Sequence, residues 1–179
     1  MKNAKLGVPS LIYFALVGLL ATQMIVGASA TGQEGPARPA LVAPAELVAA
    51  SDGVLRQRSN HSFDETVARI EAAVLAKGVR LFTTVNHKDV AAQANISLGK
   101  STLILFGDPG LGPQFLQANR YAGLDWPVRM LVVEEADGSV WLAWNDFGYI
   151  ARRHGITSRD EQFATATRVS GAIAAEAAR

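Results

Sequence analysis

The chain has 179 residues, of which 49% are hydrophobic and 18% charged, enough for one folded domain with additional segments. Its 17 basic and 16 acidic residues give a formal net charge of +1, and no basic stripe stands out, which argues against nucleic acid as a partner. The chain contains no cysteine, which excludes disulfides, thiol chemistry and thioether lipid anchors.

The N-terminal segment has the pattern of a secretory signal peptide. Lys2 and Lys5 precede an uncharged run over residues 6–30, which ends in the small residues Ala28-Ser29-Ala30. We therefore predict a signal peptide over residues 1–30, cleavage after Ala30, and a periplasmic or secreted protein. The alternative is an uncleaved membrane anchor with an exported domain, since 25 uncharged residues are long enough to span a bilayer.

Composition divides the rest of the chain. Residues 31–52 begin with a Gly- and Pro-rich stretch and are predicted to be a linker, with one helical turn over 45–50 after Pro44. Residues 53–157 are predicted to form the main domain, and residues 158–179 a C-terminal helix.

The first half of the domain predicts two strands and two helices. A strand is expected over residues 54–59, and Ser62 with Glu65 forms a capping box that starts a helix ended by Gly78. Residues 79–85 alternate as a strand, which places Val79, Leu81, Thr83 and Val85 on one side. Asn86 then caps a short helix that runs to about Ala94.

A run of five apolar or β-branched residues, 102–106, predicts a fully buried central strand. It ends in Gly107-Asp108-Pro109-Gly110, a turn at the edge of the core where sites are often built. Pro113 is placed to begin a short helix that turns Phe115 and Leu116 inward.

Residues 128–135 and 139–145 read as a β-hairpin. Asp137-Gly138 between them predicts a two-residue type I′ turn. A short helix follows over 146–154, and Ser158 with Glu161 forms a second capping box that begins the C-terminal helix. The inward face of that helix is expected to carry Phe163, Ala166, Val169, Ile173 and Ala177. The fold class is therefore α+β, with a largely antiparallel sheet covered by helices.

Several motifs, taken in order, resemble a prokaryotic family called domain of unknown function 302. They are Phe63-Asp64-Glu65-Thr66, His87, Phe106-Gly107-Asp108-Pro109, Leu124-Asp125-Trp126-Pro127 and Trp144-Asn145-Asp146. Two positions depart from the family, which usually has Asn where this chain has Asp108 and often Leu where it has Trp126. The resemblance implies a β-α-β4-α arrangement similar to the TATA-binding protein, with helices on one face, and frequent dimerisation. It implies no established activity, cofactor or catalytic residue.

Four polar residues lie at or just beyond predicted strand ends and form our candidate ligand-binding site: His87, Asp108, Asn145 and Asp146. We expect His87, Asp108 and Asn145 to converge if the strands before them run the same way. His61 and His154 are expected at exposed helix ends. Trp126, Trp141 and Trp144 cluster around the hairpin, either as packing or as a stacking platform.

These residues support three hypotheses about function. The favoured one is an exported, non-catalytic ligand-binding or interaction module, with a small-molecule ligand or a homodimer as partner. The second is a small hydrolase-like enzyme that uses His87 with Asp108 or Asp146 as an acid/base pair. The third is a purely structural dimer. We assign no catalytic residue, metal site or cofactor, and expect membrane contact only if residues 1–30 are retained.

Overall fold

The computed structural model describes residues 47–49 and 51–179; the predicted signal peptide and residues 31–46 of the predicted linker lie outside them. Six strands form one sheet in the order β1-β2-β6-β5-β4-β3. The strands are β1 (Leu47–Ala49), β2 (Val54–Arg58), β3 (Arg80–Asn86), β4 (Ser101–Gly107), β5 (Val128–Glu134) and β6 (Val140–Asn145). The helices are α1 (Phe63–Ala76), α2 (His87–Gln93), α3 (Gly112–Ala118), the 3₁₀ helix η1 (Arg120–Leu124), α4 (Phe147–Arg153) and α5 (Asp160–Ala178).

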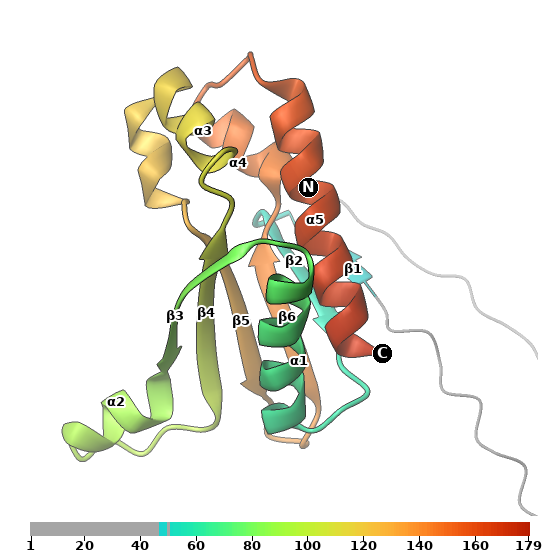
Figure 1. Ribbon diagram of the computed structural model, residues 1–179. Helices are drawn as coiled ribbons and strands as arrows, with labels where there is room; N and C mark the ends of the chain where they lie inside the picture. The colour runs from blue at the N-terminus through green and yellow to red at the C-terminus, as the bar shows by residue number, and fades with distance from the viewer. Residues whose placement is uncertain (1–46, 50) are drawn as a thin grey trace, which may run out of the picture. The chain divides into compact units, whose positions relative to one another are not determined.

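Every strand pairs antiparallel with its neighbours, which confirms the α+β class. The long elements follow the order β2-α1-β3-β4-β5-β6-α5, the expected β-α-β4-α arrangement. In Figure 1, α1 and α5 lie side by side on one face of the sheet, while α3 and α4 gather at its upper end and α2 projects at its lower end. No helix among the described residues is long and apolar enough to cross a membrane.

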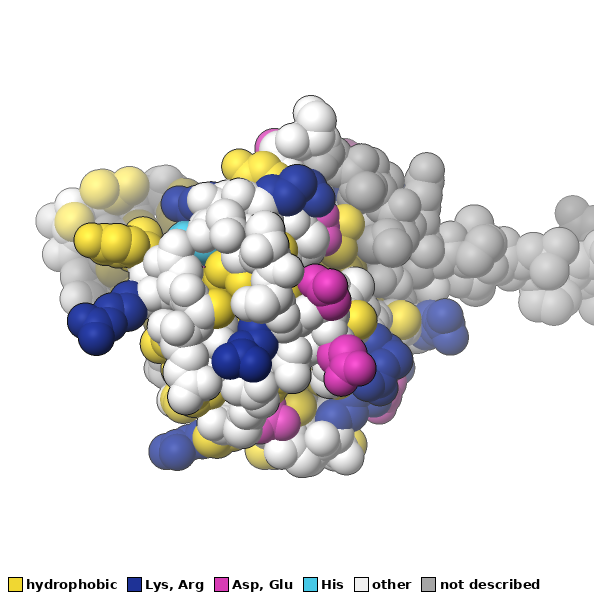
Figure 2. Space-filling view, turned by 90° about the horizontal axis from the view of Figure 1, so that it is seen from above, with side chains coloured by type: hydrophobic (Ala, Val, Ile, Leu, Met, Phe, Trp, Pro, Cys, Tyr) yellow, Lys and Arg dark blue, Asp and Glu magenta, His cyan; other side chains and the backbone are white. Residues whose placement is uncertain are grey.

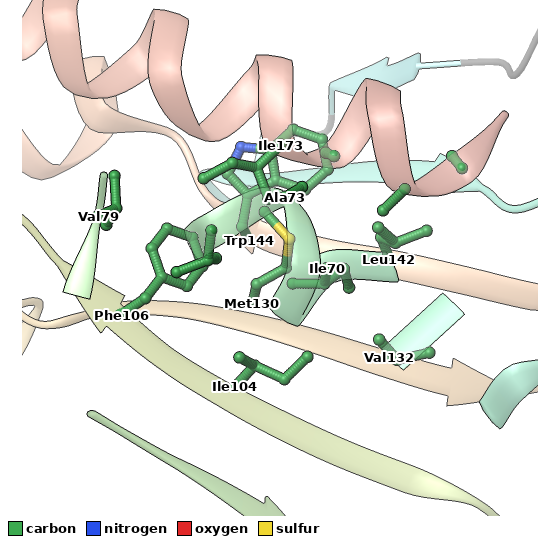
Figure 3. Packing of buried hydrophobic residues seen from close by; sticks show 14 of the residues in the cluster. Ile70, Ala73, Val79, Ile104, Phe106, Met130, Val132, Leu142, Trp144 and Ile173 are labelled. Carbon is green, nitrogen blue, oxygen red and sulfur yellow. The ribbon is translucent and has the colours of Figure 1, made fainter. Parts of the chain in front are cut away.

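Alternation along the strands makes the main core. Ile104 and Phe106 of β4, Met130 of β5 and Trp144 of β6 are buried and point toward the helices (Figure 3). The helices contribute apolar side chains that include Ile70, Ala73, Val74 and Ile173. The central strand differs from expectation, because Leu103 and Leu105 are only half-buried on the opposite face, which α1 and α5 do not cover.

Local signals fixed most of the helix ends. The Ser62 hydroxyl accepts a hydrogen bond from the Glu65 amide at 3.4 Å, as the capping box predicts. Asn86 caps α2 through the amides of Lys88 and Asp89. The second capping box is wrong: Arg159 precedes α5 with φ 76°, and no side chain caps that helix.

Strand β3 carries a bulge that the alternation did not predict. Leu81 pairs with Phe106, but Thr83 pairs with Leu105, so the register shifts between residues 81 and 83. The extra residue turns Thr83 and Val85 to the face opposite Val79 and Leu81. The Thr84 hydroxyl instead faces α1 and donates to Glu71 at 2.6 Å.

The β5–β6 hairpin is present, but its turn is not type I′. Only Gly138 has positive φ, at 80°, whereas Asp137 does not, and the Glu135 amide donates to the Ser139 carbonyl at 2.8 Å. Residues 136–138 therefore form a three-residue loop that ends in a left-handed glycine. At the N-terminal side, Leu47–Ala49 forms edge strand β1 where a helical turn was expected.

A second, smaller core fills the upper end of the domain. Phe115 of α3 stacks on Phe163 of α5 with ring centroids 4.4 Å apart, and Phe147 of α4 lies 6.5 Å from Phe115. Ala122, Ile150, Ile156 and Ala166 complete it. Helix α5 spans both cores, so the boundary between them runs beside its middle turns.

Candidate functional site

The strand directions separate the predicted site residues. Strands β4 and β6 both run antiparallel to β5, so Asp108 and Asn145 follow strand ends at the same edge of the sheet. Strand β3 runs the other way and pairs Asn86 with Thr102. His87 follows Asn86 and therefore lies at the opposite edge, and Thr102 is six residues along β4 from Asp108, or about 20 Å.

The predicted convergence of His87 with Asp108 and Asn145 is thus wrong, and so is the geometry that the hydrolase-like alternative requires. His87 Nδ1 instead lies 2.9 Å from the Ser101 hydroxyl, in a contact that joins the start of α2 to the start of β4. Among the described residues, no group of three or more His, Asp or Glu side chains is arranged to hold a metal ion.

Asp108 forms the turn that follows β4. Its Oδ1 accepts a hydrogen bond from the Gly110 amide at 2.6 Å, and its carbonyl accepts from the amides of Leu111 and Gly112. These bonds fix the direction of an exposed carboxylate at the point where β4 meets α3.

Asn145 and Asp146 have other partners. Asn145 Nδ2 donates to Asp125 Oδ1 at 3.5 Å. Asp146 caps α4, where its two carboxylate oxygens accept from the amides of Gly148 and Tyr149 at 2.9 and 3.2 Å. The capping bonds of Asp146 satisfy helix amides that otherwise have no intrahelical partner.

Asp125 is the centre of a buried polar cluster. Its side chain is 3% exposed, and its Oδ2 lies 2.6 Å from Nε2 of His154, whose side chain is 6% exposed. Arg153 reaches the same carboxylate at 3.2 Å. The expectation of an exposed His154 is wrong, because α4 folds its last turn back onto the loop between η1 and β5. The cluster joins two segments that are distant in sequence, and the side chains of Asp125 and His154 are closed to solvent.

A cleft lies where the two cores meet, and it encloses a space of about 100 Å³. Its walls come from the ends of α1 and β4, from α3, from the Trp126 loop and from one face of α5. The lining residues are mostly apolar: Val79, Phe106, Leu111, Phe115, Trp126, Val128, Phe147, Ala166 and Val169, together with Lys77, Gly107, Asp108, Gly112, Thr165 and Ser170.

The Trp126 indole forms one wall of this cleft because two glycines leave room for it. A Cβ at Gly112 would lie 1.9 Å from Trp126 Cε2, and one at Gly107 would lie 3.1 Å from Trp126 Nε1. The edge of the indole also meets Phe82, with ring centroids 5.7 Å apart. The other two tryptophans lie elsewhere: Trp144 is buried in the main core, and Trp141 is half-buried on the other face of the sheet.

Only two of the lining residues carry charge, Lys77 and Asp108. Lys77 Nζ forms an ion pair with Glu176 of α5 at 2.7 Å. Figure 2 looks onto the α3–α4 end of the molecule and shows hydrophobic side chains among basic and acidic ones.

Of the cleft residues, the sequence identified Asp108 as a candidate site residue and Trp126 as one of three tryptophans that could form a stacking platform. No local pattern marks Lys77, at the end of α1, as a site residue. Ala166 and Ser170 lie on the alanine-rich face of α5, which predicts core packing. Gly107 and Gly112 are visible in the sequence, but Trp126, whose ring occupies the space beside them, lies 14 positions beyond Gly112.

Comparison with known proteins places the chain beside longer relatives. It is 38% identical over 104 residues to two proteins named fluoride-specific ion channel FluC 1, from Brucella suis biovar 1 (strain 1330) and Brucella abortus biovar 1 (strain 9-941). The match covers 58% of this chain but only 41% and 38% of those relatives, so most of each relative lies outside it.

The fold has a solved counterpart. An uncharacterized conserved protein DUF302 from Bacillus stearothermophilus superposes with a TM-score of 0.64 over 71% of this chain and 98% of its own length, at 13% identity. The family model of "Domain of unknown function DUF302" matches residues 55–175, a range that contains every candidate residue. The chain therefore belongs to the DUF302 family.

Proposed function

We propose that this chain is an exported, non-catalytic ligand-binding domain and that its ligand occupies the cleft between the two cores. The observation that carries the proposal is the cavity itself, an apolar space of about 100 Å³ with walls from several elements and a few polar groups. Pockets of this composition are typical of small-molecule sites. Among the described lining residues there is no histidine and no pair of carboxylates, which favours binding over acid/base catalysis.

A cavity-filling pair on α5 tests this proposal. Ala166 is buried and lines the cleft, whereas Ala164 is exposed on the other side of the same helix. Benzyl alcohol serves as a small neutral probe, followed by ¹H–¹⁵N NMR. We expect shifts of cleft residues in the wild type and in Ala164→Leu, and none in Ala166→Leu. Binding that Ala166→Leu leaves intact, or no binding to the wild type, would refute the proposal.

Export is part of the same proposal. Its support is the sequence pattern of Lys2 and Lys5, the uncharged run and Ala28-Ser29-Ala30. Intact mass spectrometry of the protein from the periplasmic fraction should give the mass of residues 31–179. Membrane-bound material that retains Met1 would instead establish an anchor.

We also propose that the domain is a homodimer, as the family resemblance implies. The support is a set of exposed aliphatic side chains: Val90 on α2, and Ile96 and Leu98 in the segment after it. Helix α2 itself buries no residue, so this part of the surface is free to contact a second copy. Sedimentation equilibrium should give twice the monomer mass, and Ile96→Asp should weaken the association. A monomer at all concentrations would exclude this proposal.

A second candidate function, as a companion domain of a membrane transport protein, is favoured by the Brucella relatives. Ion passage requires membrane-spanning structure, and the described residues contain no helix suited to it, so the channel named in those relatives would reside in the part outside the match. The test is cross-linking of the full chain in membranes of its own host, followed by mass spectrometry. A cross-linked multispanning transport protein is the expected product; recovery of the uncross-linked chain alone rejects this function.

A further inference from the structure

We infer that the cleft selects an organic cation with an apolar body, held by the Asp108 carboxylate at the mouth and by the Trp126 ring inside. This inference rests on the proposed ligand-binding function and adds the chemical class of the ligand.

The two lining charges are not equivalent. Lys77 is already neutralised by Glu176, with Nζ and Oε2 2.7 Å apart. Asp108 has no such partner: within the described part of the chain, no lysine, arginine or histidine nitrogen comes within 4.0 Å of its carboxylate. The negative charge of Asp108 is therefore the lining charge that remains for a ligand to compensate.

One hydrogen bond restrains that carboxylate. Oδ1 accepts the hydrogen bond from the Gly110 amide, and this leaves Oδ2 for a ligand. The nearby guanidinium of Arg80 lies over the Phe82 ring, 5.3 Å from its centroid, and Arg80 does not line the cleft. A ligand ammonium at the mouth would thus face one oriented carboxylate rather than a pair of opposite charges.

The composition of the cleft lining favours an organic cation over a metal ion. A small metal ion requires several oxygen or nitrogen ligands, whereas this cleft offers mainly carbon surface. An ammonium group on an apolar body meets both requirements, because the body displaces water from the apolar walls and the charge stays at the mouth. The Trp126 side chain adds apolar wall for that body.

Three probes that share one apolar body test the inference: benzylammonium, benzyl alcohol and benzoate, each titrated into the mature chain at neutral pH. We expect benzylammonium to bind about two- to fivefold more tightly than benzyl alcohol, and benzoate more weakly than either. The preference should shrink as the ionic strength rises from about 0.1 M to about 1 M, because the Debye length falls to about 3 Å.

Two variants locate the source of the preference. Asp108→Asn keeps an oxygen for the Gly110 amide and removes the charge, so it should abolish the preference by lowering the affinity for benzylammonium to about that for benzyl alcohol. Asp137→Asn makes the same change in the exposed β5–β6 turn, outside the cleft, and should retain the preference.

The outcomes separate the inference from the function on which it rests. Equal binding of all three probes, or a preference that survives in Asp108→Asn, overturns the cation selectivity while the binding function stands. Failure of every probe to bind, or binding that Ala166→Leu does not affect, overturns the binding function itself.

Discussion

Trp126 occupies the space that Gly112 leaves open, and this single contact shapes the cleft. The indole lies so close that a methyl group at Gly112 has no place unless the ring moves. Asp125, its neighbour in sequence, is held by His154 and Arg153 on the other side of the same loop. Packing on one side and hydrogen bonds to the buried Asp125 carboxylate on the other thus anchor the loop that precedes β5.

We expect Gly112→Ala to destabilise the domain by about 1–3 kcal/mol, because it overpacks a fixed aromatic wall. Gly171→Ala in α5 is the matched control, since no atom lies within 4 Å of its new Cβ. That control should be neutral or stabilise the helix by up to about 1 kcal/mol. Urea unfolding followed by tryptophan fluorescence measures both, and equal stabilities of the two variants would contradict the contact.

A second residue-scale prediction concerns pH. The hydrogen bond from the Arg56 guanidinium lowers the pKa of Asp52, and the bond from the Val54 amide acts in the same direction. Because the pKa is depressed in the folded state, the contribution to stability is present above the unfolded-state pKa and is lost as the pH falls through the folded-state value. Both side chains are exposed, so salt weakens the effect.

The Arg56→Gln variant should therefore raise the pKa of Asp52 toward its ordinary value, as measured by NMR titration of the carboxyl carbon. Arg58→Gln, on the same strand, should leave Asp52 unchanged and raise the pKa of Asp137 slightly, because Arg58 is a minor cause of that lowered pKa beside the Ser139 hydrogen bonds. An Asp52 titration that does not respond to Arg56→Gln would show that the ion pair does not form in solution.

At the scale of single elements, local rules worked where the partners lie within a turn. The caps at Ser62 and Asn86 formed because each side chain needs only an amide two or three residues away. The rules failed at β3, because its pairing with β4 includes a bulge. The bulge places Thr83 and Val85 on the face opposite Leu81, whereas alternation predicted the same face. They failed again at α5, which begins without the Ser158 cap because the helix is held by its packing.

The hairpin gives a test at this scale. Gly138 has φ 80° and nothing lies within 4 Å of a Cβ placed there, so backbone conformation alone limits what fits. We expect Gly138→Val to destabilise the domain by about 1 kcal/mol or more, and Gly138→Asn by less, since Asn tolerates the left-handed region. Thermal unfolding in which Val and Asn variants match the wild type would show that the turn adopts another conformation.

At the scale of the whole molecule, α5 joins the two cores. Phe163 and Ala166 pack in the upper core, and Ile173, Ala174, Ala177 and Ala178 pack in the main one. The Ala178 carbonyl also accepts from the Asn60 amide at 2.9 Å, which fastens the end of the helix beside β2. The cleft lies between the two cores, so its shape depends on how α5 lies across both.

We therefore expect the two cores to unfold together. Ile173→Ala should lower the free energy of unfolding by about 2–5 kcal/mol, because it leaves a cavity at a fully buried position. Far-ultraviolet circular dichroism and tryptophan fluorescence should report one coincident transition in the wild type and the variant. Two separate transitions would show that the upper core folds independently of the main one.

The sequence by itself determined the α+β class, most element positions and the family resemblance, because alternation, caps and turn residues act over a few neighbouring positions. Only the tertiary structure decided which strand ends share an edge, and it placed His87 at the edge opposite Asp108 because β3 and β4 run in opposite directions. It also buried His154 against Asp125 and brought α5 over the end of β4. Those contacts join residues distant in the chain, and no local pattern encodes which distant partner a residue will meet.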